Sequence, residues 1–203
     1  MGATRPHARL LSNKTHYSAT DPEARISIKP GKVRALNYLC SLAVDTAKGI
    51  ISHVQADLAD SRDSLHLPGL VQRLQQRLQA NDLQLRDLVA DTGYSNGFNY
   101  ALLENQGITP WIPVFGAYKP EVEDFNYHAT ADEYRCQADK PLPFRKYSTK
   151  ADGGWVKHYR AFYQDCQHCP YKARCVPYAD HKQLNRSAFD AAYRRAWHRQ
   201  RSR

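Results

Sequence analysis

Strand-like and helix-like segments follow one another in a definite order between residues 38 and 115, and this order constrains the fold most strongly. Residues 38–44 and 50–56 are apolar stretches on either side of the turn sequence at residues 45–49, a pattern that predicts a β-hairpin. A helix is expected over residues 68–80, where apolar side chains recur at helical spacing. These side chains are Leu70, Val71, Leu74 and Leu78.

A second set of segments follows. Residues 85–90 predict a short apolar strand, residues 97–106 a helix closed by Gly107, and residues 111–115 a further strand. The order hairpin, helix, strand, helix, strand predicts an α/β fold, a mixed sheet with flanking helices. From residue 116 to residue 151 the regular pattern dissolves into aromatic, proline and charged residues.

Basic residues exceed acidic ones by 29 to 20, and the net charge of +9 is concentrated near the end of the sequence. Residues 172–203 hold nine Lys or Arg residues and only two acidic ones, and residues 187–201 show helical spacing. This charge fits a polyanionic partner, with nucleic acid as the first candidate. The alternative is a solvated helix face. The candidate DNA-binding residues are Lys182, Arg186, Arg194, Arg195 and Arg199.

The sequence contains neither a membrane-helix pattern nor an export-signal pattern. No apolar run approaches the roughly 20 residues that a membrane helix needs, and residues 1–11 lack the apolar stretch of a secretory signal. The five cysteines are an odd number, which favours free thiols or a metal site over a disulfide framework. We therefore expect a cytoplasmic, nucleoid-associated protein.

Four of the cysteines form a candidate structural zinc site. Short-spaced thiolates on a loop, joined by one from a distant strand, are the usual ligands of tetrahedral zinc. The candidates are Cys136, Cys166, Cys169 and Cys175. The alternatives are buried free thiols in a small aromatic subdomain, or disulfides. His168 and His181 are spare ligands that we expect to be solvated, and Cys40 is expected in the core because it alternates into a predicted strand.

Asp91 is the candidate catalytic residue. The apolar strand at residues 85–90 leads directly into this carboxylate, and Thr92 and Gly93 let the backbone turn before the next helix. In α/β sheets, active-site residues lie at the carboxyl ends of strands, where a carboxylate can hold a divalent cation. The competing interpretation is an aspartate that only caps the next helix.

The other acidic residues have simpler interpretations. Asp45 is expected to be a turn residue and Glu104 a solvated residue on the helix after Asp91. Three further aspartates are expected near the N-terminal end of the first long helix, where negative charge is favourable. They are Asp57, Asp60 and Asp63, of which Asp60 is also a candidate for supporting a metal ligand.

Several segments together resemble the insertion-sequence DDE transposases. The segment at residues 90–94 (ADTGY), with residues 102–108 (LLENQGI) and Ile112-Pro113, is similar to the region around the second catalytic Asp of that family. The resemblance extends over roughly residues 17–195. Its other segments are residues 19–25 (ATDPEAR), residues 43–45 with 49–51, residues 59–61 (ADS), and the cysteine-bearing stretch from Cys136 to Cys175.

The resemblance implies an RNase H-like catalytic fold in which two Asp and one Glu hold two Mg²⁺ ions. It implies DNA cleavage at transposon ends, strand transfer to target DNA, and an oligomeric complete enzyme. Only the second Asp of the set corresponds to a residue here, Asp91. The first Asp and the Glu have no counterpart, so we expect a truncated enzyme that is inactive alone.

The expected organisation has four parts. They are an irregular basic lead-in (residues 1–35), a partial RNase H-like core (36–116), an aromatic and Cys-rich insertion (117–185) and a truncated basic helix (186–203). The principal functional hypothesis is a Mg²⁺-dependent DDE transposase fragment. The alternatives are a non-catalytic, zinc-containing DNA-binding remnant, and another RNase H-like nuclease with its own carboxylate set.

Overall fold

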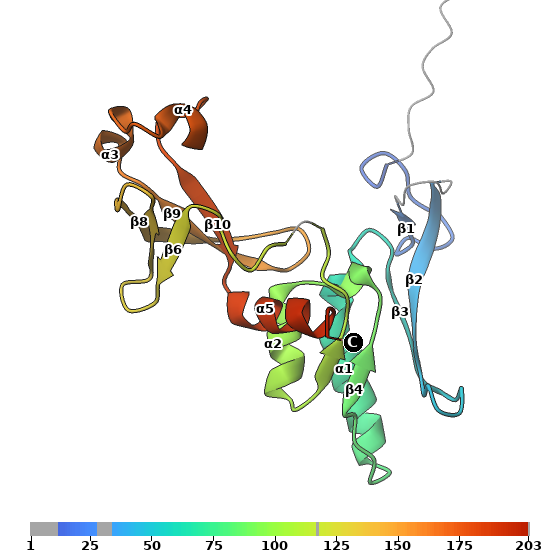
Figure 1. The fold of residues 1–203 in the computed structure, drawn as a ribbon. Coiled ribbons are helices and arrows are strands. Elements are labelled where there is room, and N and C mark those ends of the chain that lie inside the picture. Colours follow the sequence, from blue (N-terminus) through green and yellow to red (C-terminus); the bar gives the residue numbers. More distant parts are fainter. Residues whose placement is uncertain (1–11, 28–33, 117, 203) are drawn as a thin grey trace, which may run out of the picture. The chain divides into compact units, whose positions relative to one another are not determined.

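The computed structural model describes residues 12–27, 34–116 and 118–202 and divides the chain into two compact units (Figure 1). The first unit is Met1–Gln84 and the second is Leu85–Arg203. The predicted catalytic core, residues 36–116, therefore includes residues of both units. The predicted lead-in, residues 1–35, lies partly outside the described residues.

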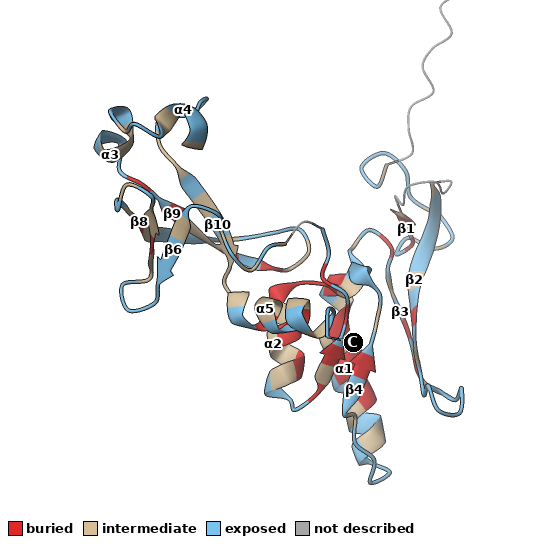
Figure 2. Ribbon diagram, viewed as in Figure 1, coloured by how far each residue is buried: buried red, intermediate tan, exposed pale blue. Residues whose placement is uncertain are grey.

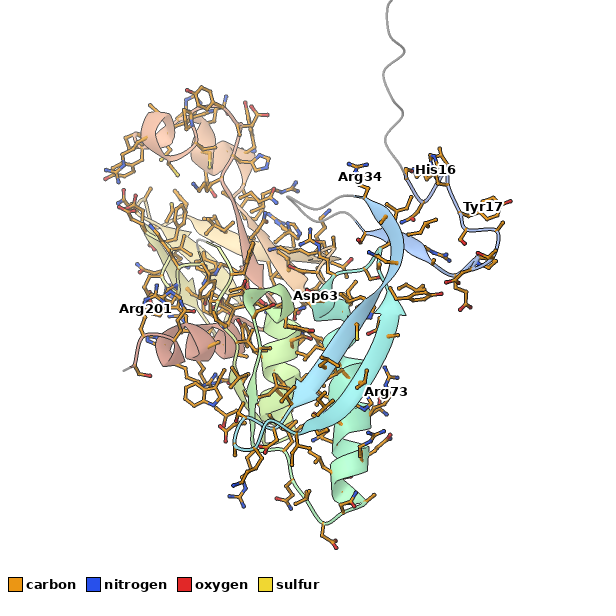
Figure 3. All side chains as sticks on the ribbon, turned by 90° about the vertical axis from the view of Figure 1, so that its right-hand side faces the viewer. His16, Tyr17, Arg34, Asp63, Arg73 and Arg201 are labelled. Carbon is orange, nitrogen blue, oxygen red and sulfur yellow. The ribbon has the colours of Figure 1, made fainter. Side chains whose placement is uncertain are left out.

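The first unit is a three-stranded antiparallel sheet packed against one long helix. The strands β1 (Arg25–Ser27), β2 (Ala35–Val44) and β3 (Ile51–Leu58) pair in the order β1-β2-β3. The helix α1 (Asp63–Gln79) contacts β3, and Arg73 of α1 donates to the side chain of Gln55 on β3 at 3.0 Å (Figure 3). The predicted hairpin and helix are confirmed, although α1 begins five residues earlier than expected and β1 forms within the predicted irregular lead-in.

The core of the first unit comes from α1 and β1 rather than from the alternating apolar residues of β2. Ile26, Leu67 and Val71 are almost fully buried. In the hairpin, the buried residues are polar ones such as Ser41 and Gln55, whereas Leu42 is exposed. The prediction that Cys40 lies in the core is wrong, because this residue lies on the exposed face of β2.

The second unit begins with a short parallel pair of strands followed by helices. The strands β4 (Asp87–Val89) and β5 (Thr109–Trp111) pair in parallel. A single 3₁₀ turn, η1 (Thr92–Tyr94), and the helix α2 (Gly97–Asn105) connect them. Gly107 has the expected positive φ of 72° after α2. The strand predicted at residues 111–115 is wrong in position: pairing ends at Trp111, and Pro113 has no N–H to donate to a neighbouring strand.

A five-stranded antiparallel sheet forms where the sequence shows little regular pattern. Its order is β10-β9-β8-β7-β6. The strands are β6 (Phe125–His128), β7 (Glu133–Cys136), β8 (Pro141–Thr149), β9 (Trp155–Arg160) and β10 (Gln183–Ser187). Tyr134, Leu142, Tyr159 and Ala161 form its small core. The expectation of an irregular stretch over residues 116–151 is therefore wrong.

Three helices complete the second unit. The short helices α3 (Tyr163–Gln167) and α4 (Lys172–Cys175) lie between β9 and β10, beyond the ends of these strands (Figure 1). The helix α5 (Asp190–Arg199) packs on α2 and falls within the predicted basic helix. The described residues thus form a mixed α/β fold, as the sequence predicts, but with several sheets and five α-helices rather than one mixed sheet with flanking helices.

Candidate functional site

Asp91 follows β4 directly and has the backbone conformation of a helix cap. Its Oδ1 accepts the backbone N–H of Gly93 at 2.7 Å, and the residue is exposed. Oδ2 has no hydrogen-bond or ion-pair partner among the described residues. The capping role that the sequence allowed is therefore present, and it uses one carboxylate oxygen while the other faces solvent.

The backbone that carries Asp91 is supported by buried polar contacts. The neighbouring N–H of Ala90 donates to the Trp111 carbonyl of β5 at 3.4 Å. Behind η1, Ser95 Oγ lies 2.8 Å from the hydroxyl of Tyr100, which donates to the Ile112 carbonyl at 3.2 Å. Burial raises the pKa of Tyr100 well above its ordinary value, so the phenol stays protonated. These contacts fix the strand end from which the Asp91 side chain projects.

The other acidic residues do not join Asp91 in a cluster of carboxylates. Asp45 accepts the N–H groups of Ala47 and Lys48 at 3.3 and 3.0 Å, as expected of a turn residue. Asp63 lies in the first turn of α1, as expected, and Asp60 is 3.8 Å from Arg25. Within the part of the chain that the structure describes, no group of three His, Cys, Asp or Glu residues is arranged to hold a metal ion.

Glu104 corrects the prediction of a solvated helix residue. Its side chain is only 17% exposed and receives hydrogen bonds from two arginines of α5. Arg195 donates at 2.6 Å and 3.0 Å, and Arg199 at 3.1 Å. Burial alone would raise the pKa of Glu104, but the two guanidinium groups outweigh it and hold the pKa below its ordinary value. Glu104 therefore holds α2 against α5.

The residues proposed to bind DNA are all occupied by contacts within the chain. Arg186, with a side chain only 11% exposed, donates to Asp190 and to the carbonyls of Lys119 and Pro120. Arg194 pairs with Glu121 at 2.7 Å and Asp190 at 3.5 Å. These partners give Arg186, Arg194, Arg195 and Arg199 a structural role, and their binding to DNA stays a prediction.

A basic pocket on the five-stranded sheet was not anticipated from the sequence. Arg145 and Lys146 of β8, His158 and Arg160 of β9, and Gln183 of β10 line about 340 Å³ of open space. No acidic residue lines this pocket. The signal available in the sequence was the pair of basic segments at residues 145–146 and 157–160, which only strand pairing brings together.

The four candidate zinc ligands line one cavity. All four side chains line a cavity of about 40 Å³. They are Cys136 at the end of β7, Cys166 in α3, Cys169 between α3 and α4, and Cys175 at the end of α4. All are free thiols. His168 is exposed, as expected, and neither it nor His181 is among the residues that line this cavity.

Comparisons with known proteins do not assign the chain to a family. No family model matches the sequence, and neither curated proteins nor solved structures give a significant match. In the described part of the chain, no helix combines the length and apolar character needed to cross a membrane.

Proposed function

We propose that this chain is part of a DDE transposase, an enzyme that cuts and joins DNA with Mg²⁺, and that Asp91 is its second catalytic carboxylate. The observation that carries the proposal is the exposed Asp91 carboxylate at the end of β4, with one oxygen free. The resemblance of residues 90–94 and 102–108 to the segment around that aspartate in the family supports the same assignment.

The donor chemistry of Asp91 fits Mg²⁺ in kind, although one carboxylate is only part of a ligand set. Mg²⁺ prefers hard oxygen ligands and is commonly bound through one or two carboxylates. Paired Mg²⁺ ions, when bound, would activate the attacking oxygen and stabilise the leaving oxygen of phosphoryl transfer. Asp91 would orient one such ion, while its hydrogen bond to Gly93 holds the carboxylate in place. The other two carboxylates are proposed to come from outside the matched segments.

The proposal includes an RNase H-like fold for the catalytic core. The mixed α/β elements and the parallel pair β4–β5 support it, while the hairpin β2–β3 and the pair β4–β5 form separate sheets in the described structure. The proposed partner is DNA, whose phosphates the basic pocket on β8 and β9 would contact.

Because the chain is expected to be inactive alone, the test expresses it together with flanking reading frames that would supply the other two carboxylates, and it compares Asp91→Asn with Asp87→Asn. Asp87 is a matched control because it lies on β4, the strand that leads to Asp91, and is exposed. It accepts the indole N–H of Trp111 at 2.8 Å, and an asparagine oxygen could accept the same hydrogen bond. The measurement is excision of the flanking element from a plasmid. Asp91→Asn should abolish excision, because an amide cannot supply the anionic oxygen, whereas Asp87→Asn should retain it.

Equal excision by the unaltered and Asp91→Asn genes would refute the role of Asp91. If the unaltered gene supports no excision and the purified chain still binds duplex DNA, the alternative function gains support. That alternative is a non-catalytic, zinc-containing DNA-binding remnant. It is favoured by one observation, the cavity that all four candidate zinc ligands line.

A further inference from the structure

The segment that contains α3 and α4 is not stabilised by a buried apolar helix face, which is the usual source of helix stability in proteins. The two helices span five and four residues, and neither contains a buried residue. Figure 2 shows them without buried residues, beyond the end of the five-stranded sheet. Isolated helices of this length are unstable in water, and most helices in proteins are stabilised by an apolar face packed on a core. Some other interaction must therefore hold this segment to the sheet.

The four cysteines are placed where such an interaction is needed. Three of them, Cys166, Cys169 and Cys175, lie on the α3–α4 segment, and Cys136 is the last residue of β7, where the turn to β8 begins. Cys136 and Cys166 also pack against the small core of the sheet. All four line the same cavity of about 40 Å³. A group bound by all four would join the helical segment to the sheet.

The backbone around the cysteines already forms tight turns. The N–H of Cys136 donates to the Lys140 carbonyl at 3.1 Å, and the Cys136 carbonyl accepts the N–H of Asp139 at 2.8 Å. The Cys166 carbonyl accepts the N–H of Cys169 at 3.4 Å. Each cysteine has a single rotatable side-chain bond before its sulfur. No three of these side chains are arranged as metal ligands in the described structure, so zinc binding requires the cysteine side chains to rotate and bring their sulfurs together.

The surrounding charges complement a thiolate-bound metal ion. Four thiolates and one Zn²⁺ carry a net charge of two minus. Lys140, Lys172, Arg174 and Lys182 also line the cavity. Arg174 is paired with Asp124 and Lys140 lies 3.9 Å from Asp165, but Lys172 and Lys182 have no carboxylate partner among the described residues. Two uncompensated positive charges thus lie beside the proposed site, and Lys182 is held there by its hydrogen bond to the Cys175 carbonyl at 3.1 Å.

We propose that Cys136, Cys166, Cys169 and Cys175 bind one structural Zn²⁺ ion that fixes the α3–α4 segment to the β7–β8 turn. On binding, the four thiols lose their protons to solvent and four Zn–S bonds form. Four protein ligands leave no open position, which is characteristic of structural rather than catalytic zinc. This inference does not depend on the proposed DNA chemistry.

The test is the zinc content of the full chain, purified under reducing conditions without a histidine tag, and of two cysteine variants. The unaltered chain should contain about one zinc per chain, and replacement by Co²⁺ should give the absorption bands of a tetrahedral thiolate complex. Cys40→Ser, the control from β2, should be unchanged. Cys136→Ser should bind zinc about tenfold or more weakly, since even loss of a supporting partner costs 10- to 100-fold.

Three results would overturn the inference. In the first, the unaltered chain contains no zinc and all its thiols are reactive. In the second, Cys166 and Cys169 form a disulfide, and in the third, Cys136→Ser binds zinc as tightly as the unaltered chain. If Cys136→Ser does not fold, hydrogen exchange of the unaltered chain decides. Chelation should then remove amide protection in the α3–α4 segment and leave α1 protected. Asp91→Asn should keep its zinc, so that failure of the proposed function is distinguishable from failure of the zinc site.

Discussion

Among single residues, Glu104 has the most consequential set of contacts. It receives hydrogen bonds from Arg195 and Arg199, and Arg199 also donates to the Pro110 carbonyl next to β5 at 2.9 Å. One carboxylate thereby joins α2 to α5, and through Arg199 to β5. Glu104 and Arg199 are largely buried, whereas the side chain of Arg195 is 58% exposed, so loss of the carboxylate would leave mainly Arg199 poorly compensated.

The first prediction concerns Glu104→Gln. This variant should lower the free energy of unfolding by about 1 to 2 kcal/mol, mainly because the charged hydrogen bond between Glu104 and the largely buried Arg199 is weakened, since solvent screens the pair with Arg195. Chemical denaturation at neutral pH measures the change. Glu123→Gln is the control, since Glu123 is exposed and has no ion-pair partner among the described residues. A cost equal to that of the control would show that the pairs add nothing.

The pH dependence of this effect has a definite sign. The pKa of Glu104 is lower in the folded chain than its ordinary value of 4.5, which applies after unfolding. Its contribution to stability is therefore complete above pH 4.5 and is lost as the pH falls below that value. The difference between the unaltered chain and Glu104→Gln should shrink in the same range. A difference that stays constant through this acid range would contradict the assigned pKa shift.

At the scale of elements, local sequence patterns predicted those elements whose own residues carry a periodicity. The hairpin, α1, β4, α2 and α5 belong to this group. The strands β6 to β10 do not, because β8 (PLPFRKYST) has only Leu142 buried and is defined by pairing with its neighbours. The same limit applies to the sites. The short spacing of the cysteines in one segment allowed a metal site to be predicted. The partners of Glu104 could not be predicted, because they lie about 90 residues away along the chain.

The packing of α2 against the last part of the chain depends on a glycine that no pattern singled out. Gly97 begins α2, and a Cβ at this position would collide with Ser187 Oγ and lie 3.1 Å from the Cβ of Phe189. Phe98 and Tyr100 of α2 also contact Phe189 and Tyr193, with ring centroids 5.7 and 5.2 Å apart. The absence of a side chain at Gly97 therefore permits the close approach of α2, β10 and α5.

We predict that Gly97→Ala destabilises the second unit by about 1 to 3 kcal/mol, the usual cost of overpacking. Gly69→Ala in α1 is the matched comparison. There the new Cβ would meet only the flexible end of Arg73, and alanine favours a helix interior by about 0.5 to 1 kcal/mol over glycine. Thermal unfolding of both variants gives the signs. A stabilising Gly97→Ala would refute the close packing at this position.

Across the whole molecule, the basic residues behind the net charge of +9 differ in whether they are already paired with carboxylates of the chain. The arginines of β10 and α5 are paired with Asp190, Glu121 and Glu104. The cations of the basic pocket are not neutralised in this way: among the described residues, Arg145 stacks on Phe162, and Arg160 has no carboxylate partner. The arginines that the sequence suggested for DNA binding therefore have partners within the chain, and their binding to DNA stays a prediction. We propose the pocket on β8 and β9 as a second surface for DNA, because its cations are not paired with carboxylates.

This difference predicts how DNA binding responds to charge removal. The double variant Arg145→Ala/Arg160→Ala should weaken binding to duplex DNA and reduce the slope of log affinity against log salt by roughly 2, about one for each lost phosphate contact. The control, Lys14→Ala/Lys48→Ala, removes the same charge from exposed positions in the first unit and should leave the slope nearly unchanged. Fluorescence anisotropy at several salt concentrations measures both. If both double variants reduced the affinity and the salt slope equally, DNA would be attracted by net charge alone. A pocket that contacts phosphates directly must lower both quantities more than the control does.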